Sequence, residues 1–217
     1  MNTLKQLCRG IGAAALLALA PVAANANLTL ESGLVGGSGD VSNVVFNPCG
    51  LGAQLGTTIT GCLNDAPLTF VNFTSTEVLT TGGGGQATVV AADGLFDNVE
   101  IKLADSLIGF SKLQFNLDAA ADGTANFEAI DQFGGVFTFN NIALSGSGQN
   151  FFTLGSEDGQ VAVSFKLTST VGIQNISDLE QVRIGPTAIA TPEPMSMAIL
   201  GMGLLGLGAV WMRRRAA

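Results

Sequence analysis

The chain lacks two residue types on which many active sites depend. It has no histidine and no tyrosine among its 217 residues, and its single tryptophan, Trp211, lies close to the C-terminus. Without histidine, the usual general base of a serine nucleophile is missing. Without tyrosine, and with tryptophan confined to the tail, the aromatic platforms that many lectins stack against sugar rings are missing as well. These absences argue against serine catalysis and against a stacking lectin.

Basic residues are also scarce. Between Asn27 and Thr191, a stretch called the body below, four Lys and Arg residues stand against sixteen Asp and Glu residues, a formal net charge of −12. Nucleic-acid binding needs clustered Lys and Arg, so we expect no nucleic-acid partner. An acidic surface keeps an exported protein in solution, and it leaves divalent cations or basic partners as alternatives.

Residues 1–26 have the pattern of a secretory signal peptide. A short basic stretch precedes an apolar one, and Ala24 and Ala26 form a small-x-small pattern that predicts a cut before Asn27 by signal peptidase. The apolar stretch is too short for a stable membrane span. Cys8 lies before that stretch and not directly after the cut, which argues against an N-terminal lipid anchor. We expect Cys8 to leave with the signal peptide.

Two cysteines remain after export, Cys49 and Cys62. In an oxidising compartment an even pair predicts one disulfide, here closing a loop rich in Gly and Thr. The alternative is a metal site, but two cysteines without histidine do not complete a zinc site.

The C-terminal residues 192–217 combine three features in direct succession. A Pro-Glu-Pro tripeptide comes first, then eighteen uncharged, mostly apolar residues at 195–212, then three arginines two residues before the end. As a helix the apolar run spans roughly 27 Å, close to the thickness of a bilayer's hydrocarbon core. The arginines predict a stop to transfer and a cytoplasmic end. The residues concerned are Pro192, Glu193, Pro194, Arg213, Arg214 and Arg215.

This succession resembles the PEP-CTERM sorting signal, which is read by the exosortase system of exopolysaccharide-producing Gram-negative bacteria. The resemblance implies that an exosortase-type enzyme recognises Pro192, Glu193 and Pro194 while the span 195–212 holds the precursor in the inner membrane. It implies processing near the motif, and the glycine-rich span fits a marginal anchor that is removed. An ordinary C-terminal anchor is the alternative.

The body has the period-two pattern of half-buried strands throughout. Clear alternation covers 98–103, 112–117, 160–167 and 181–184, and further strands are expected at 41–46, 68–73, 76–80, 87–91, 125–131, 136–140 and 151–154. Hairpin turns are expected at 93–94, 122–123 and 158–159, with flexible tips at 82–85 and 145–148. The one short helical turn expected is 176–180, with Ser177 as its cap. Most of the 13 phenylalanines, all in the body, should be core.

The strand and turn spacing predicts an all-β fold, an antiparallel β-sandwich, with a jelly roll or barrel as the alternative. The signal-peptide helix and the C-terminal transmembrane helix flank it. The expected organisation is therefore signal peptide 1–26, sandwich 27–185, linker 186–191 and sorting signal 192–217.

Carboxylate pairs near turns are the remaining candidates for chemistry. Asp93 with Asp97, Asp118 with Asp122, and Glu157 with Asp158 could serve general acid-base catalysis. Turn aspartates usually bond nearby backbone instead, so we expect no catalytic residues and no enzyme activity. We expect no cofactor, with a structural calcium ion near 118–123 as an open alternative.

The sequence thus predicts a non-enzymatic surface or extracellular-matrix protein. It is exported, anchored briefly in the inner membrane, then released to the cell surface or matrix, where the resemblance implies association with exopolysaccharide or biofilm. Two alternatives remain: a β-sandwich module that binds polysaccharide or calcium, and a matrix hydrolase.

Overall fold

The computed structural model describes residues 27–189, apart from 38, 84, 158 and 170–175. The expected signal peptide 1–26, the motif 192–194, the span 195–212 and the arginines 213–215 lie outside these residues. Among the residues described, no helix is long and apolar enough to cross a bilayer. The described residues up to Thr187 belong to one compact unit.

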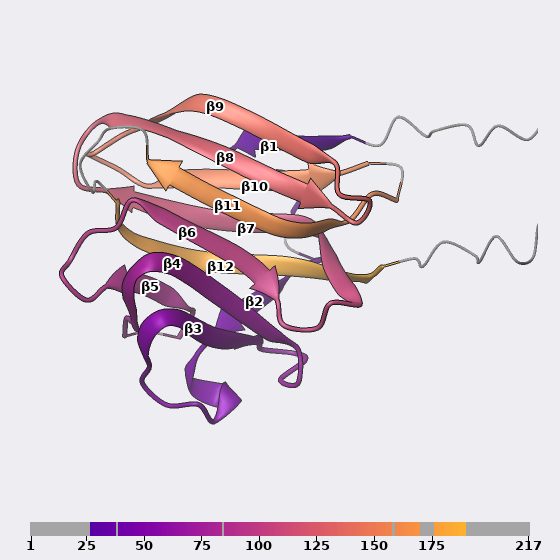
Figure 1. Cartoon of the computed structure of the whole chain (residues 1–217), viewed down its shortest axis with the longest axis horizontal. Helices are drawn as coiled ribbons and strands as arrows, with labels where there is room; N and C mark the ends of the chain where they lie inside the picture. Colours follow the sequence, from indigo (N-terminus) through magenta and orange to yellow (C-terminus); the bar gives the residue numbers. More distant parts are fainter. Residues whose placement is uncertain (1–26, 38, 84, 158, 170–175, 190–217) are drawn as a thin grey trace, which may run out of the picture. The chain divides into compact units, whose positions relative to one another are not determined.

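Twelve strands and a single 3-10 turn are found in the described part of the chain (Figure 1). They are β1 Leu28–Ser32, β2 Ser42–Val45, η1 Asn47–Cys49, β3 Leu55–Leu63, β4 Phe70–Thr81, β5 Thr88–Ala91, β6 Asn98–Leu103, β7 Ile108–Ala119, β8 Gly123–Asp131, β9 Val136–Leu144, β10 Asn150–Ser156, β11 Ala162–Ser169 and β12 Ile176–Ala188.

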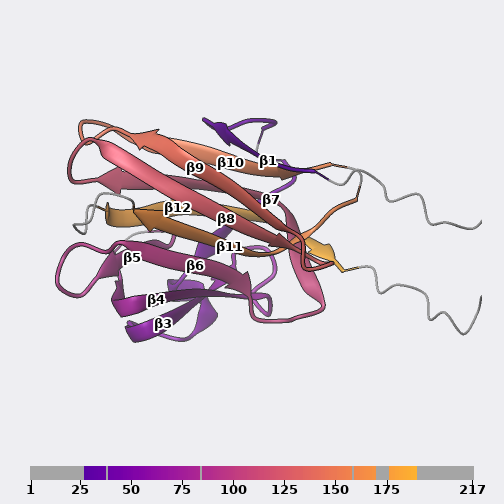
Figure 2. The same cartoon turned by 45° about the horizontal axis from the view of Figure 1, so that its top comes forward.

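The strands form one continuous sheet folded into two layers, as Figures 1 and 2 show. Its order is β1-β10-β7-β12-β2-β3-β4-β6-β11-β8-β9, with β5 pairing β12 and β4. Neighbours such as β10 and β7, or β8 and β11, pair antiparallel. The layer of β9, β8, β11, β6, β4 and β3 packs over the layer that holds β1, β10, β7 and β12. The predicted all-β antiparallel sandwich is confirmed.

A single backbone pairing closes seven of the strands into a ring. Phe110 of β7 pairs with Ala162 of β11. The path from β7 through β12, β2, β3, β4, β6 and β11 therefore returns to β7. Gly109 stands at this junction. A Cβ on Gly109 would overlap Val161 Cγ1 and lie 2.5 Å from the Ala162 carbonyl oxygen. The sandwich therefore also has the barrel-like closure of the alternative expectation, and the closure requires glycine.

Phenylalanines fill the space between the layers. Phe115 of β7 lies 5.9 Å from Phe127 of β8 and 5.3 Å from Phe165 of β11, measured between ring centroids. Phe152 of β10 joins the same cluster at 5.1 Å from Phe127. Each fully buried ring stabilises the fold by about 1.5–3 kcal/mol relative to an exposed one. Eight of the 13 phenylalanines are buried, so their predicted core role is confirmed for the majority.

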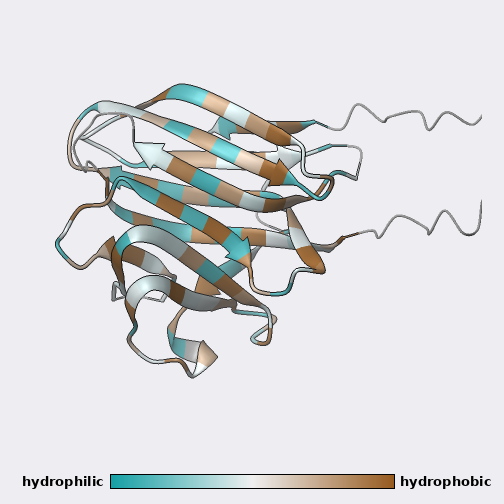
Figure 3. Cartoon of the chain, in the orientation of Figure 1, coloured by the Kyte–Doolittle hydropathy of each residue, from teal (hydrophilic) through white to brown (hydrophobic). Residues whose placement is uncertain are grey.

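The alternating pattern located most strands correctly. Figure 3 shows the brown and teal alternation along β6, β8 and β11 that the sequence pattern implies. The turn at 93–94 lies between β5 and β6, and Gly94 has φ +107° as a tight turn requires. The expected strands 68–73 and 76–80 are one strand, β4. Two strands, β1 and β3, were not expected.

The helical turn predicted at 176–180 is wrong, because this segment is the start of β12. Asp178 pairs with Val90 of β5, and Glu180 pairs with Thr88. Ser177 caps no helix, and its Oγ donates to the Asp118 carbonyl oxygen at 3.0 Å. β12 also runs to Ala188, three residues into the stretch expected to be linker.

Candidate functional site

The outer face of β7 carries a row of polar side chains. Because Leu113, Phe115 and Leu117 point into the core, the alternate residues of the strand point away from it. The antiparallel register continues this polar face onto the neighbouring strands: Gln114 lies opposite Thr153 of β10, which lies opposite Glu31 of β1. Three adjacent strands therefore present hydroxyl, amide and carboxyl groups on one surface.

Part of the loop between β1 and β2, residues 33–37, 39 and 40, crosses this polar face and is called the strap below. Thr153 Oγ1 donates to the Gly33 carbonyl oxygen at 2.8 Å and accepts from the Val35 backbone N–H at 3.0 Å. Gln114 Nε2 donates to the Val35 carbonyl oxygen at 3.1 Å. These contacts explain why Gln114, although on the outer face, is buried. The strap is thus fixed on the sheet by side chains of β7 and β10.

Lys112 fastens the far half of the strap. Its Nζ donates to the Gly36 carbonyl oxygen at 2.9 Å and to the Gly37 carbonyl oxygen at 3.1 Å, and it pairs with the Asp40 carboxylate at 3.1 Å. The Lys112 side chain is mostly buried while the Asp40 carboxylate is mostly exposed. These three acceptors hold the Lys112 ammonium group against the far half of the strap.

A groove of about 270 Å³ lies between the strap and the strands. Its polar side chains come from β1, the strap, β7 and β10, and the glycine backbone of the strap and of β10 completes it. Two carboxylates face one ammonium group, so the groove carries a small excess of negative charge. The lining residues used below are Glu31, Asp40, Ser111, Lys112, Thr153 and Ser156.

A second polar cluster lies further along the same face, where β7 meets β12. Asn116 Nδ2 donates to Glu180 Oε1 at 3.0 Å. Burial first, and then the charges of Glu180 and Asp118, raise the pKa of the Asp178 carboxyl to about 6. The buried acceptor atoms Asn116 Oδ1 and Asp178 Oδ1 have no hydrogen-bond partner in the described part of the chain. The carboxylates of Asp118, Asp178 and Glu180 therefore lie close together. Neither of the two described ion pairs involves any of them.

The carboxylate pairs considered as catalytic groups serve local structure where their contacts are described. Asp122 Oδ1 accepts from the Gly146 backbone N–H at 2.8 Å, and Asp97 Oδ1 accepts from the Asn98 side-chain amide. Asp118 lies on β7 beside β12 and is not drawn to Asp122 by any described hydrogen bond. Asp158 lies outside the described residues. Asp122 thus has the backbone-bonding role expected of a turn aspartate, whereas Asp97 bonds a neighbouring side chain.

A serine and two lysines meet at Glu100 of β6. Ser164 Oγ donates to Glu100 Oε1 at 2.6 Å, and Lys102 Nζ lies 2.8 Å from the same oxygen. Burial acts to raise the pKa of the Glu100 carboxyl, but the hydrogen bonds from Lys102 and Ser164 and the charges of Lys102 and Lys166 together lower it. A carboxylate whose pKa is lowered is a poor general base, so this cluster does not activate Ser164.

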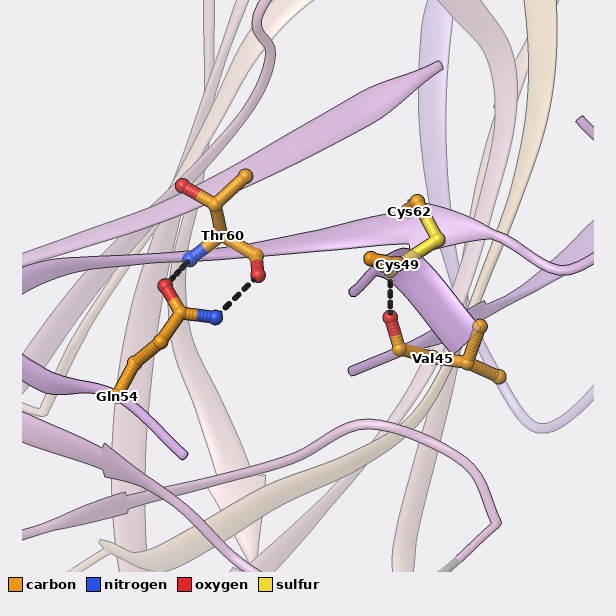
Figure 4. The surroundings of a disulfide bond; sticks show 5 residues. All are labelled: Val45, Cys49, Gln54, Thr60 and Cys62. Carbon is orange, nitrogen blue, oxygen red and sulfur yellow. Dashed lines mark hydrogen bonds between the residues drawn. A yellow bond between two sulfur atoms is a disulfide. The ribbon is translucent and has the colours of Figure 1, made fainter. Parts of the chain in front are cut away.

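The predicted disulfide is confirmed. Cys49 and Cys62 are bonded, with their Cα atoms 5.7 Å apart (Figure 4). Cys49 Sγ also lies 3.0 Å from the Val45 carbonyl oxygen, a contact and not a hydrogen bond, because a disulfide sulfur has no hydrogen to donate. The enclosed loop is held a second time by Gln54, whose amide donates to the Thr60 carbonyl oxygen and accepts from the Thr60 N–H. The disulfide is consistent with an extracellular protein.

Among the residues described, no group of three or more His, Cys, Asp or Glu side chains is placed to hold a metal ion. The stretch 118–123, where calcium was the open alternative, divides between the end of β7 and the start of β8. Its Asp122 bonds the turn between β9 and β10.

Comparison with known proteins leaves the family open. No protein-family model matches the chain, and no curated protein matches it. Among solved structures, it is similar to a mutant of the family 29 carbohydrate-binding module CBM29-2, with 11% identity and a TM-score of 0.34 over 77% of this chain and 99% of that one. The enzymatically active domain of bacteriophage CBA120 tailspike protein 4 matches at 15% identity and a TM-score of 0.27, over 76% of this chain and 20% of that one.

The apo CBM1 of BiXyn10A matches at 16% identity and a TM-score of 0.21, over 69% of this chain and 89% of that one. At these identities and TM-scores, the likeness is too low to assign the chain to any of these classes.

The groove was not foreseen from the sequence. Lys112 was expected only as the polar side of a strand, and Glu31, Asp40 and Thr153 were not singled out. The available signal was a glycine-rich segment, 33–39, whose backbone offers carbonyl groups without side chains. Its partners lie 75 to 120 residues away along the chain, so only the fold brings them together.

Proposed function

We propose that this chain is an exported, non-catalytic β-sandwich module that binds a neutral polysaccharide at the cell surface or in the extracellular matrix. The observation that carries this proposal is the groove under the strap. It combines hydroxyl groups, carboxylates and a fixed ammonium group on a rigid support, and these are the groups that hydrogen-bond to sugar hydroxyls. Such a ligand needs no metal, nucleophile or general base from the protein.

The chemistry of the groove supports the choice of a neutral glycan. Glu31 and Asp40 exceed Lys112 in charge, and Lys112 already pairs with Asp40. A uronic-acid polymer would meet like charge both here and across a body with a net charge of −12. None of the described residues that line the groove is aromatic, so a sugar ring has no stacking platform among them. We therefore expect weak binding, with a Kd on the order of 1 mM, or about −4 kcal/mol.

Delivery to that location rests on the two ends of the chain. The proposed route is export by the signal peptide 1–26, brief anchoring by 195–212 and recognition of Pro192, Glu193 and Pro194 by an exosortase-type enzyme. The disulfide supports an oxidising destination.

Titration with soluble neutral polysaccharides, such as β-glucans and mannans, tests the binding site, with alginate as the anionic comparison. We expect saturable heat with a neutral polymer, and Glu31→Gln should weaken binding about tenfold because a hydrogen bond to a charged group contributes about 1.5 kcal/mol or more. Glu128→Gln, on β8 of the other layer, is the matched control and should leave affinity unchanged. Absence of binding to every neutral polymer, or equal effects of the two variants, would overturn the proposal.

A further inference from the structure

Four large apolar side chains are exposed on three turns or turn edges of the body. Leu68, in the turn between β3 and β4, is 90% exposed, and Leu107, between β6 and β7, is 64% exposed. Phe133, between β8 and β9, is 68% exposed, and Val136, the first residue of β9, is 58% exposed. These four residues are called the apolar rim below. Phe133 is the one phenylalanine in the described part of the chain that is classed as exposed.

The three turns lie at the same end of the sandwich. The Ala104 N–H donates to the Phe70 carbonyl oxygen at 2.9 Å, which joins the turn after β6 to the start of β4. The start of β7 pairs with the start of β11 through Phe110, and the Gln132 N–H donates to the Val161 carbonyl oxygen at 3.0 Å. The turn that carries Phe133 is thereby placed beside the same junction. Figure 1 shows these turns together at the right.

Both ends of the body reach this same end. The Glu157 N–H donates to the Asn27 carbonyl oxygen at 3.2 Å, which places the first described residue beside the turn between β10 and β11. Thr187 Oγ1 donates to Ser111 Oγ at 3.0 Å, which places the end of β12 beside the start of β7. The apolar rim thus shares its end of the body with the point from which the chain continues toward residue 190.

The opposite end differs in character. The turns there follow β4, β5, β7 and β9, and the described residues of these turns include no exposed large apolar side chain. The turn 145–149, for example, consists of Ser, Gly and Gln alone. The other exposed apolar side chains lie in the strap, near the disulfide loop and on β4. Of the five described large apolar side chains that are more than half exposed, the four of the apolar rim lie at the end that carries the chain ends. The fifth, Leu55, begins β3 at the opposite end, opposite Thr80.

The short stretch between Ile189 and the expected membrane span indicates the lipid bilayer as the partner of the apolar rim. Five residues separate Ile189 from Met195, where the expected membrane span begins. An extended chain advances at most about 3.3–3.6 Å per residue, so the end of the body lies within about 20 Å of the span's first residue. An anchored precursor must hold this end close to the lipid surface, whichever way the connecting residues run.

We propose that the apolar rim rests on the lipid bilayer while the precursor is anchored, which orients the body with its opposite turns facing away from the membrane. This inference rests on the proposed membrane-anchored tail. Tethering supplies a high local concentration, so even four side chains that bind lipid weakly on their own are held in contact with it. After removal of the tail the contact is lost, because the acidic body has no comparable attraction to lipid.

The test uses the chain from Asn27 to Ala217 reconstituted in phosphatidylcholine vesicles that contain nitroxide-labelled lipid. An environment-sensitive fluorophore is placed on Phe133→Cys in one preparation and on Ser147→Cys, in an opposite turn, in another. We expect at least threefold stronger quenching of the Phe133→Cys probe than of the Ser147→Cys probe. Equal quenching of the two probes would overturn the proposal.

Trp211 separates this inference from the proposed tail. It is the only tryptophan in the chain and lies inside the expected span, so its own quenching reports insertion of the tail. A quenched Trp211 with an unquenched Phe133→Cys probe would refute the rim contact and leave the tail intact. An unquenched Trp211 would refute the anchor, and the rim contact with it.

A second set of variants guards against effects of the probe itself. With the fluorophore on Val136→Cys, the combined changes Leu68→Ser and Leu107→Ser should reduce quenching at least twofold, while Leu55→Ser, outside the rim, should not. In the absence of lipid, the emission of the fluorophore on Val136→Cys should not change with protein concentration. Emission that shifts toward that of an apolar environment as the protein concentration rises would show that a second copy covers the rim, and would overturn the proposal.

Discussion

Asp178 is a carboxyl group that the fold destabilises when it is charged. It is partly buried on β12 beside Glu180 and Asp118, and burial with these charges raises its pKa from 3.8 to about 6. The folded state therefore holds the proton more tightly than the unfolded state does. The contribution of Asp178 to stability is greatest below about pH 4 and is lost as the pH rises through about 6.

Asp178→Asn should consequently stabilise the protein at neutral and alkaline pH. A rise in the pKa from 3.8 to about 6 corresponds to at most about 3 kcal/mol, and partial exposure of the carboxyl reduces this to about 1 kcal/mol. Urea unfolding at pH 8 should show a gain of this size, and at pH 4 the gain should vanish, because the native Asp178 is then protonated in the fold. Asp93→Asn, at an exposed turn, is the control and should change stability by less than about 0.5 kcal/mol.

Single residues also show what the sequence could not reveal at the site. The row Lys112, Gln114 and Asn116 reads in sequence as the solvent side of a strand. In the fold Gln114 and Asn116 are buried, because the strap covers one and Glu180 bonds the other. Pattern alone gives the side of the strand on which a residue lies, and it does not show what a distant segment will place on top.

At the scale of single elements, the closure of the ring depends on Gly109. Its hydrogen is the only substituent that fits against Val161 and the Ala162 carbonyl group. We expect Gly109→Ala to force β7 and β11 apart and to lower the free energy of unfolding by about 1–3 kcal/mol, the range of overpacked core positions. Gly148→Ala, where a Cβ meets nothing within 4 Å, is the matched control and should change stability by less than about 0.5 kcal/mol.

Chemical denaturation of the two variants gives this comparison directly. If Gly109→Ala is as stable as Gly148→Ala, the pairing of Phe110 with Ala162 does not depend on glycine. The near-ultraviolet spectrum, dominated by phenylalanine in the body, would further report whether the aromatic cluster loosens with the closure.

Elements with regular alternation were predictable, and those without it were not. β6 and β11 alternate cleanly and were located within about two residues. β3, Leu55–Leu63, is rich in Gly and Thr and was taken for a loop, yet Thr58 and Thr60 bond Thr74 and Asn72 across the strand pair. Pairing partners, which periodicity does not identify, decide whether such a segment is a strand.

The helical turn expected at 176–180 fails for a related reason. Ile176, Leu179 and Val182 are buried at intervals of three, which imitates the spacing of a helix face. Gln181 adopts φ +54°, and this left-handed residue interrupts the alternation of β12. An irregularity inside a strand moves the next inward-facing side chain by one position. The buried residues of a strand can then be three apart, and the sequence pattern resembles that of a helix.

At the scale of the whole molecule, the two ends of the chain are proposed to be targeting signals that are removed. The sandwich is proposed to be the mature protein. Intact mass of the protein recovered from culture fluid should begin at Asn27, contain the disulfide, and lack residues 195–217. Replacing Pro192, Glu193 and Pro194 with alanine should retain the tail and keep the protein with the cells. Extracellular protein that still carries residues 195–217 would contradict the proposed sorting.

The thirteen residues of β12 connect the sandwich to its tail, and they are flanked by β7 on one side and by β2 and β5 on the other. Traction applied through the tail would run along the axis of this interior strand. Its hydrogen bonds would then resist the load together, in shear, instead of opening one after another as at a sheet edge. A precursor held by its tail would therefore withstand pulling forces far better than the same sandwich pulled through β1.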